Sequence, residues 1–225
     1  MNMLTPLEKL TNQDRILILG ASRGLGWALY GQLIRIIPQA QFLLSSRKIL
    51  DRKEYVTENT TLLAQDFSKI PIAVDFINSV KSFAPTRIIY VAGGGPYGSY
   101  VAKKWSDHQW ALTTTFLYPA ELLHTLLSQS ENFASLAQVT FVGSQIADNQ
   151  PDRNAASYAA AKHALRGLIT TVQLEVQSKP QILLFSPGYM QTDLIPAGSW
   201  PIQQGLAQDP AAVADQLIAF IEKNN

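Results

Sequence analysis

Six short and almost uninterrupted apolar runs restrict the possible folds of this chain more than any other feature. A strand exposed on one face alternates apolar and polar residues, whereas a strand covered on both faces is apolar throughout. The runs are of the second kind and read RILILG from residue 15, QFLLSS from 41, TLLAQD from 61, RIIYVAGG from 87, QVTFVGS from 138 and QILLFSPG from 181. We therefore expect six strands buried inside a sheet.

Amphipathic segments separate these runs and are long enough for crossover helices; they span residues 27–37, 72–83, 109–129 and 156–177. Repeated strand–helix units with right-handed crossovers wind into a doubly wound parallel α/β sheet with helices on both faces. The chain has 225 residues and no internal repeat or linker, so we expect one domain over residues 1–225. The Gly-, Pro- and Gln-rich segment 187–210 is a candidate lid, because ligands of such folds bind beyond the carboxyl ends of the strands.

Composition and charge argue against several classes of function. The formal net charge is +1 and the basic pairs are short, so we expect no basic face for a nucleic acid. The chain has no cysteine and its three histidines are scattered, so we expect no metal site. No segment resembles a secretory signal or a membrane span. The expected location is therefore cytoplasmic.

The glycine-rich stretch GASRGLG, residues 20–26, follows the first apolar run and opens the first amphipathic segment. Gly20, Gly24 and Gly26 allow positive φ angles and let a pyrophosphate approach the backbone closely. The amino end of the helix adds free N–H donors and a partial positive charge. The stretch therefore indicates a phosphate-binding loop, although a tight strand-to-helix turn that binds nothing has the same spacing.

The end of the second run indicates which dinucleotide such a loop would bind. Folds of this kind that prefer NAD usually carry an acid there, whereas an arginine accommodates the 2′-phosphate of NADP. The run ends with Ser46 and Arg47 and without an acid, and Arg23 projects from the glycine loop nearby. Two guanidinium groups at one place favour NADP(H). The alternative is that Arg47 is an ordinary solvated surface residue.

Residues after the third and fourth runs are further candidates for cofactor contacts. Asp66 and Phe67 follow the third run, where an adenine ring would lie, but Asp66 is equally suited to capping the turn that follows. The stretch AGGG, residues 92–95, follows the fourth run and would let a cofactor lie flat against the backbone. It is also compatible with a merely flexible start of a loop.

Tyr158 and Lys162 are four residues apart in SYAAAKHAL, so they share one face of a helix. An ammonium near a phenol stabilises the phenolate, so we expect the pKa of Tyr158 to fall below its usual value of about 10 and the residue to act as a general acid. Tyr100 and Lys104 have the same spacing. Tyr158 is preferred because Ser144 ends the preceding strand, where its hydroxyl can bond a substrate oxygen.

The stretches GASRGLG, AGG, YAAAK and SPGYMQT, together with Ser144, resemble the classical short-chain dehydrogenase/reductase family in order and separation over almost the whole chain. The resemblance implies a Rossmann-type sheet, a nicotinamide cofactor and a carbonyl or alcohol substrate. It also implies that Tyr158 is the catalytic acid/base and that Ser144 orients the carbonyl. Lys162 would hold the nicotinamide ribose and lower the pKa of the tyrosine, and Thr192 would touch the carboxamide.

The glycine loop, the strand ends and the resemblance together predict a set of cofactor contacts. All of them are expected at the carboxyl edge of the sheet, where parallel strands end together. The predicted contacts are Gly20, Ser22, Arg23, Gly24, Leu25, Gly26, Ser46, Arg47, Asp66, Phe67, Ala92, Gly93, Gly94, Tyr158, Lys162, Pro187, Gly188 and Thr192.

Two departures from the family pattern modify these expectations. The family's asparagine in the fourth main helix, which helps to hold a proton-relay water, is replaced by Thr115 in TTTFLYPAELL. Its hydroxyl can take over that role as a catalytic residue, or it can bond back to its own helix. The sequence ends after DPAAVADQLIAFIEKNN, so we expect a sheet without the family's last strand. Since that strand often supports a tetramer interface, a homodimer or a monomer is expected instead.

The sequence thus predicts an NADP(H)-dependent oxidoreductase that transfers a hydride between nicotinamide and a small carbonyl or secondary alcohol compound. A protein that binds NADP(H) as a sensor or regulator, without turnover, is the main alternative. A structural α/β domain without a ligand is the third. An apolar substrate pocket can be lined by Trp105, Trp110, Tyr97, Tyr189, Met190 and Trp200, although aromatic residues more often serve packing.

Overall fold

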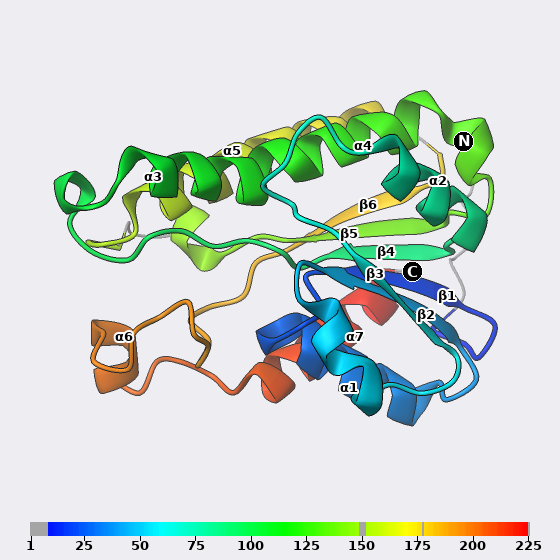
Figure 1. The fold of residues 1–225 in the computed structure, drawn as a ribbon, viewed down its shortest axis with the longest axis horizontal. Coiled ribbons are helices and arrows are strands. Elements are labelled where there is room, and N and C mark those ends of the chain that lie inside the picture. The colour runs from blue at the N-terminus through cyan, green and yellow to red at the C-terminus, as the bar shows by residue number, and fades with distance from the viewer. Residues whose placement is uncertain (1–8, 149–151, 177, 225) are drawn as a thin grey trace.

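A computed structural model describes residues 9–148, 152–176 and 178–224. All six apolar runs are strands of one parallel sheet, which confirms the doubly wound, Rossmann-type expectation (Figure 1). The strands are β1 Arg15–Leu19, β2 Gln41–Ser46, β3 Thr60–Ala64, β4 Arg87–Tyr90, β5 Gln138–Val142 and β6 Gln181–Phe185. Their order is β3-β2-β1-β4-β5-β6, so the winding direction reverses between β1 and β4. Ligands of such sheets bind beyond the carboxyl ends of the strands at this reversal.

Helices cover both faces of the sheet (Figure 1). On one face lie α1 (Gly24–Ile36) and α7 (Pro210–Lys223), which pack against each other and against the sheet. On the other face lie α2 (Val74–Phe83), α4 (Tyr118–Ser128) and α5 (Ala156–Glu175). The crossovers therefore bury the sheet on two sides, as the continuous apolar runs require.

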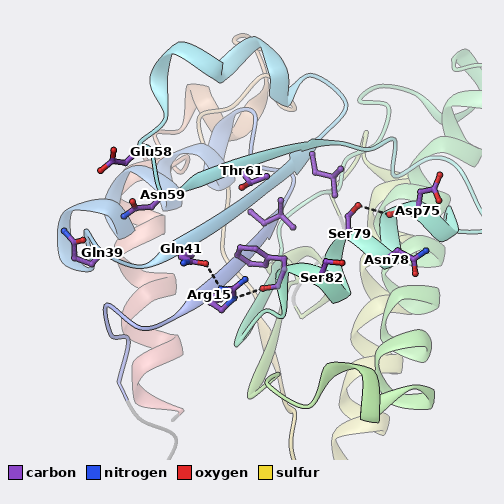
Figure 2. Close-up of a pocket in the computed structure, with 13 residues that line it drawn as sticks. Arg15, Gln39, Gln41, Glu58, Asn59, Thr61, Asp75, Asn78, Ser79 and Ser82 are labelled. Carbon is purple, nitrogen blue, oxygen red and sulfur yellow. Dashed lines mark hydrogen bonds between the residues drawn. The ribbon is translucent and has the colours of Figure 1, made fainter.

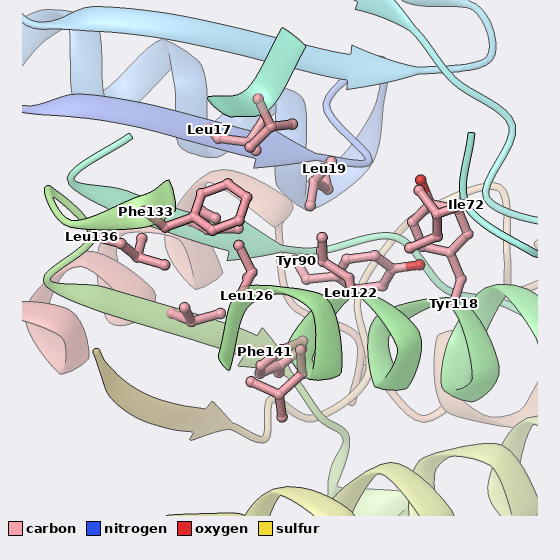
Figure 3. Packing of buried hydrophobic residues seen from close by; sticks show 14 of the residues in the cluster. Leu17, Leu19, Ile72, Tyr90, Tyr118, Leu122, Leu126, Phe133, Leu136 and Phe141 are labelled. Atoms are coloured by element: carbon pink, nitrogen blue, oxygen red, sulfur yellow. The ribbon is translucent and has the colours of Figure 1, made fainter. Parts of the chain in front are cut away.

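Strand β1 shows why its sequence does not alternate. Leu17 and Leu19 lie on the face covered by α2, α4 and α5 and share a cluster with Leu122 (Figure 3). Ile16 and Ile18 point to the opposite face and pack in the cluster of α1 and α7. All four side chains are fully buried, because successive residues of a strand face opposite sides of the sheet and both sides are covered.

The long helical stretch that the sequence predicts over 109–129 is interrupted in the structure. It consists of α3 (Trp105–Leu112), a π-helical turn η3 (Thr113–Leu117) and α4. In this turn the backbone N–H of Tyr118 donates to the carbonyl of Thr113, and the carbonyl of Thr114 accepts the hydroxyl of Tyr90 at 2.7 Å. π-Helical turns of this kind occur frequently at functional sites. Here the turn contains Thr115.

Segment 187–210 leaves β6 and returns to α7 as a closed loop. Its two ends are held together because Gln208 N donates to the carbonyl of Tyr189 and Gln191 N donates to that of Gln208, both at 2.9 Å. The loop carries the short helix α6 (Trp200–Gln203). Other connections contain short helical turns at η1 Ile49–Tyr55, η2 Tyr100–Ala102, η4 Ser130–Phe133 and η5 Gln145–Ala147.

A broad groove of about 990 Å³ lies between strands β1–β3 and helix α2 (Figure 2). Arg15 crosses it, donating to the side chain of Gln41 and to the carbonyl of Phe83, both at 2.6 Å. Arg15 and Gln41 are the first residues of their strands. This part of the groove therefore lies at the edge of the sheet opposite to the one where doubly wound folds bind ligands.

The amino ends of β1 and β4 are joined by a buried ion pair, which predicts a large effect of Asp14→Ala on stability. Asp14 Oδ1 lies 3.2 Å from Arg87 Nε and also accepts the Thr86 hydroxyl at 2.7 Å. Removing the carboxylate leaves the buried guanidinium without this partner, so the free energy of unfolding should fall by about 3–5 kcal/mol in urea titrations. Asp215→Ala, at an exposed position of α7, should change it by less than about 0.5 kcal/mol. Equal effects of the two substitutions would contradict this account.

Candidate active site

The loops that follow β4, β5 and β6 meet the first turns of α5 around a cavity of about 160 Å³. Ser144 follows β5 and caps the turn η5, and Tyr158 lies in the first turn of α5. Both side chains line the cavity, together with Gly94, Gly188 and Thr192. The structure thus brings together residues that are up to about a hundred positions apart in the sequence.

The hydroxyls of Ser144 and Tyr158 both line the cavity and lie near each other. Burial raises the pKa of Tyr158 above its usual value, and the neighbouring hydroxyl of Ser144 lowers it only in part. The sequence-based prediction that the pKa of Tyr158 falls below its usual value is therefore wrong. The reason is that the ammonium of Lys162 lies 5.5 Å from the centre of the ring and donates to the carbonyl of Val142 at 2.6 Å, while desolvation acts on the phenol directly.

Lys162 lies almost completely buried one helical turn after Tyr158. Burial lowers the pKa of its side chain to about 7, because the charged form loses its hydration. A β-carbon added to Gly93 would lie 3.3 Å from the Lys162 Nζ. The ammonium therefore faces the backbone that follows β4, next to the cavity.

Thr115 bonds to the loop after β4 and not to its own helix. Its hydroxyl accepts the N–H of Gly94 and donates to the carbonyl of Gly94, both at 3.0 Å. The neighbouring Thr113, by contrast, donates to the carbonyl of Gln109 within its own helix. Of the two alternatives for Thr115, back-bonding is therefore wrong, and the residue fixes the backbone beside the cavity.

The glycine run after β4 is closely packed, so a merely flexible loop start does not describe it. A β-carbon on Gly94 would lie 2.9 Å from the ring of Trp110, and one on Gly95 would lie 2.9 Å from the β-carbon of Tyr158. Real β-carbons do not approach neighbouring atoms this closely. The glycines let the backbone pass directly beside the catalytic candidates.

The glycine loop after β1 has the shape of a phosphate cradle. Gly20 has φ +98° and a β-carbon there would lie 2.6 Å from the N–H nitrogen of Ala92, while one on Gly26 would lie 2.4 Å from the carbonyl oxygen of Gly20. Helix α1 begins at Gly24 without a side-chain cap. Its first N–H groups therefore have no capping oxygen, which suits an anion. Segment 187–210 reaches this loop, because Thr192 would lie 3.3 Å from a β-carbon on Gly24.

The end of β2 offers hydroxyl groups but no acid. The hydroxyls of Ser45 and Ser46 are buried and have no hydrogen-bond partner among the described residues. Arg47 is exposed, and the guanidinium of Arg23 is turned toward Asp193 of segment 187–210, with 3.2 Å between Nη1 and Oδ2. The two guanidinium groups that the sequence places together thus do not interact with a common partner in this structure.

Asp66 caps a turn, as one of its two alternatives predicted. Burial raises its pKa, but hydrogen bonds from the N–H and hydroxyl of Ser68 and the charges of Arg47 and Lys69 outweigh this effect and hold the pKa below its usual value. The side chain of Phe67 is 5% exposed and packs 5.0 Å, between ring centres, from Tyr118. It cannot contact an adenine from there, so only the Phe67 backbone remains available.

The remaining predicted contacts lie around the same edge. Leu25 is buried in the core beneath the glycine loop, so only its backbone faces outward. The carbonyl of Pro187 accepts the N–H of Gln145 at 3.0 Å, and a β-carbon on Gly188 would lie 3.1 Å from the Gln145 side chain. Gln145, in the loop after β5, thus contacts the loop after β6 at Pro187 and Gly188.

The aromatic residues suggested for the pocket divide into two groups. Tyr97, Tyr189 and Met190 line the cavity. Trp110 packs against Gly94, whereas Trp105 and Trp200 are 62% and 55% exposed and do not line it. Tyr100, the other tyrosine with a lysine four residues on, is also half-exposed, and Lys104 lies outside its short helix.

A family model described as short chain dehydrogenase matches residues 14–198, which is most of the chain. The chain belongs to the short-chain dehydrogenase family, a family of oxidoreductases. A curated relative, the cyclic-di-GMP-binding biofilm dispersal mediator protein of Escherichia coli (strain K12), is 24% identical over 183 residues, which cover 81% of this chain and 75% of the relative. In the described part of the chain, no helix has the length and apolarity needed to cross a membrane.

Solved structures of this family share the fold at low sequence identity. A Burkholderia cenocepacia short-chain dehydrogenase in complex with NADP is 22% identical, covers 95% of this chain and 91% of its own, and gives a TM-score of 0.72. BdcA in complex with NADPH is 21% identical, with 90% and 84% covered and a TM-score of 0.69. A family member from Francisella tularensis is 18% identical, with 92% and 90% covered and a TM-score of 0.75.

Sequence reasoning about this short-chain dehydrogenase missed Arg52. Its Nε donates to the carbonyl of Ser22 in the glycine loop at 2.8 Å, and its guanidinium stacks 4.7 Å from the ring centre of Trp27 in α1. Arg52 therefore holds the loop from outside. The basic stretch SRKILDRK after the second strand contains it, but only the fold shows which of its cations reaches the loop.

The two hydrogen bonds of Thr115 predict an effect that separates it from Thr113. Thr115→Val keeps the shape but leaves the buried N–H and carbonyl of Gly94 unpaired, so the free energy of unfolding should fall by about 1–3 kcal/mol in urea titrations. Thr113→Val removes a bond at a partly exposed position of the same π-helical turn and should cost less than about 0.5 kcal/mol. If the two substitutions cost the same, Thr115 does not fix the loop after β4.

Proposed function

We propose that this protein is an NADP(H)-dependent oxidoreductase that interconverts a small carbonyl compound and the corresponding alcohol. The observation that carries the proposal is that Ser144 and Tyr158 lie together at the wall of one cavity, with Lys162 one helical turn away and facing the loop after β4. A phenol, a hydroxyl and an ammonium at one place are the groups that carbonyl reduction needs from a protein.

The residues present fit a dinucleotide with a 2′-phosphate. The glycine loop and the uncapped start of α1 would hold the pyrophosphate. The unpartnered hydroxyl of Ser46 lies where the adenosine ribose would end, and Arg47 and Arg52 follow it in the chain. Since no acid ends β2, NADP(H) is favoured over NAD(H). The solved relatives that hold NADP or NADPH support this choice.

The cofactor and the protein contribute different parts of the reaction: the cofactor carries the hydride and the protein carries the proton. NADPH, when bound, supplies the hydride for the carbonyl carbon, and NADP accepts it in the reverse direction. Tyr158 donates its phenolic proton to the carbonyl oxygen, which yields the alcohol and leaves a phenolate to be reprotonated from solvent. Its raised pKa keeps the phenol protonated and ready to donate at neutral pH. Ser144 lies beside the phenol at the cavity wall and would bond the carbonyl oxygen.

Lys162 and Thr115 support this proton transfer. The Lys162 side chain lies 5.5 Å from the centre of the Tyr158 ring, and in its charged form it would stabilise the phenolate that proton transfer leaves. It would also bond the nicotinamide ribose. Thr115 is a positioning residue, because it holds Gly94 and not a reacting group. We further propose that segment 187–210 acts as the substrate lid of a single domain over residues 1–225, since Met190, Thr192 and Leu194 line the cavity.

A regulator that binds NADP(H) without turnover is the second candidate. It is favoured by the curated relative, whose name describes a cyclic-di-GMP-binding mediator of biofilm dispersal. The two candidates differ in one observable. An oxidoreductase consumes NADPH in the presence of some carbonyl compound, whereas a regulator binds NADPH and leaves it intact. A ligand-free structural domain would show no rise in melting temperature with either nicotinamide cofactor.

Tyr158→Phe tests the proposed general acid. The substitution should lower kcat with a panel of ketones and aldehydes by about 10²–10⁴-fold, because it removes the transferable proton. NADPH affinity, measured by calorimetry, should change little, since the ring remains. Tyr100→Phe is the matched control in the other tyrosine–lysine pair and should leave both quantities unchanged. Retained turnover in Tyr158→Phe would refute the assignment.

Arg52→Met tests the cofactor end of the site. Losing the bond to Ser22 and the cation near the predicted 2′-phosphate should weaken NADPH binding by about tenfold or more, because hydrogen bonds of charged groups contribute about 1.5–3 kcal/mol each. NADH binding should fall less. Lys53→Met, at the exposed neighbouring position, is the control for general charge. Calorimetric titration of both cofactors measures the difference, and an unchanged NADPH affinity would count against this role.

A further inference from the structure

The cavity beside Ser144 and Tyr158 is small, and its wall carries a single formal charge. Its volume of about 160 Å³ lies below the range of about 300–1,000 Å³ that is usual for ligand pockets. Apolar side chains such as Ile146 and Leu194 form part of the wall. Among the described residues that line it, Asp152 is the one with a carboxylate, and none carries an ammonium or a guanidinium.

The Asp152 carboxylate and backbone both make hydrogen bonds near the cavity. The hydroxyl of Tyr189 donates to its Oδ2 at 3.0 Å. The backbone carbonyl of Asp152 accepts the N–H groups of Asn154 and Ala155, at 3.2 and 3.4 Å, in the turn that leads directly into α5. Asp152 thus lies in the turn just before α5, whose first turn carries the catalytic phenol of Tyr158.

Tyr189 remains a donor toward Asp152. Burial, the hydrogen bond to Asp152 and the negative charge of that carboxylate raise the pKa of Tyr189 to about 12. The phenol is therefore protonated at neutral pH and occupies one oxygen of the carboxylate. In the described part of the chain, no side chain donates to the other oxygen, Oδ1. Its remaining acceptor capacity is available at the wall of the cavity.

A partly buried carboxylate without a cation beside it selects what binds next to it. It accepts short hydrogen bonds from hydroxyl and ammonium groups and repels carboxylates and phosphates. A purely apolar ligand would leave it desolvated and unpaired, which is unfavourable. The wall therefore discriminates among small carbonyl compounds by the group that they carry next to the reacting carbon.

We propose that the cavity takes a small carbonyl compound or alcohol that carries a hydrogen-bond donor, a hydroxyl or an ammonium group, near the reacting carbon, and that Asp152 binds this donor and excludes carboxylates. The inference rests on the proposed function, because it assumes that the reacting oxygen is held by Ser144 and Tyr158. Asp152 is on this account a specificity-determining residue. If it served only to orient Tyr189, the charge of the substrate would not matter.

Four small methyl ketones test this directly. In hydroxyacetone, aminoacetone and butanone the methylene beside the carbonyl carries a hydroxyl, an ammonium or a methyl group, and in pyruvate a carboxylate is bonded to the carbonyl carbon itself. For the whole protein with NADPH, kcat/KM should be at least about tenfold higher for hydroxyacetone or aminoacetone than for butanone, with pyruvate lowest. The ratio of the first two ketones distinguishes hydroxyl from ammonium recognition.

Binding supplies a readout that does not depend on turnover. The matching alcohols propane-1,2-diol, 1-aminopropan-2-ol, butan-2-ol and lactate are titrated into the complex with NADP⁺ by calorimetry or ligand-detected NMR. Their affinities should follow the same order as the ketones. If the ketones are turned over with similar kcat/KM values, the proposed function is upheld and this inference is overturned. The expected binding order without any turnover would uphold this inference and overturn the proposed function. If no ketone is turned over and no alcohol binds, both are overturned.

Asp152→Asn is the decisive variant, because the amide keeps the size of the side chain and an acceptor for Tyr189 while removing the charge. It should lower the preference for aminoacetone over butanone by at least about tenfold and relieve the exclusion of pyruvate. Asp148→Asn is the matched control, since Asp148 lies four residues earlier, pairs with Arg166 and does not line the cavity. An unchanged order in Asp152→Asn, or the same change in Asp148→Asn, would overturn the assignment.

Discussion

The backbone that follows β4 passes so close to the catalytic candidates that side chains are crowded or excluded along it, and the rest of the site depends on this contact. A β-carbon on Gly93 would lie 3.3 Å from the Lys162 Nζ, and one on Gly95 would lie 2.9 Å from the β-carbon of Tyr158. The first contact is crowded and the second is sterically excluded. Gly94 lies between these two glycines, and its N–H and its carbonyl are both hydrogen-bonded to the hydroxyl of Thr115. Because interiors are close-packed, a shift of this loop would displace the phenol and the ammonium together.

The fold and the identity of the central residues are largely predictable from the sequence, because they depend on local patterns. Continuous apolar runs predict strands covered on both faces, and a spacing of four predicts that Tyr158 and Lys162 share a helix face. The bonds of Thr115, the contact of Arg52 with the glycine loop and the raised pKa of Tyr158 are not predictable in this way. They depend on which distant segments the fold places together, and on how much water it removes from each group.

Segment 187–210 connects the cofactor end of the site with the substrate end. Thr192 lies against Gly24, and Asp193 pairs with Arg23, so one part of the segment touches the glycine loop. Tyr189, a few residues earlier, bonds Asp152 at the wall of the cavity. A single loop is thus in contact with both halves of the proposed site.

A crystal structure of the complex with NADPH tests the central claim most directly, because it locates the reactive ring and the diphosphate at the same time. The account predicts the diphosphate over the glycine loop, the ribose within hydrogen-bond distance of Lys162, and the nicotinamide beside the phenol of Tyr158. A cofactor bound elsewhere, for example in the groove beside α2, or a nicotinamide out of reach of Tyr158 would contradict it.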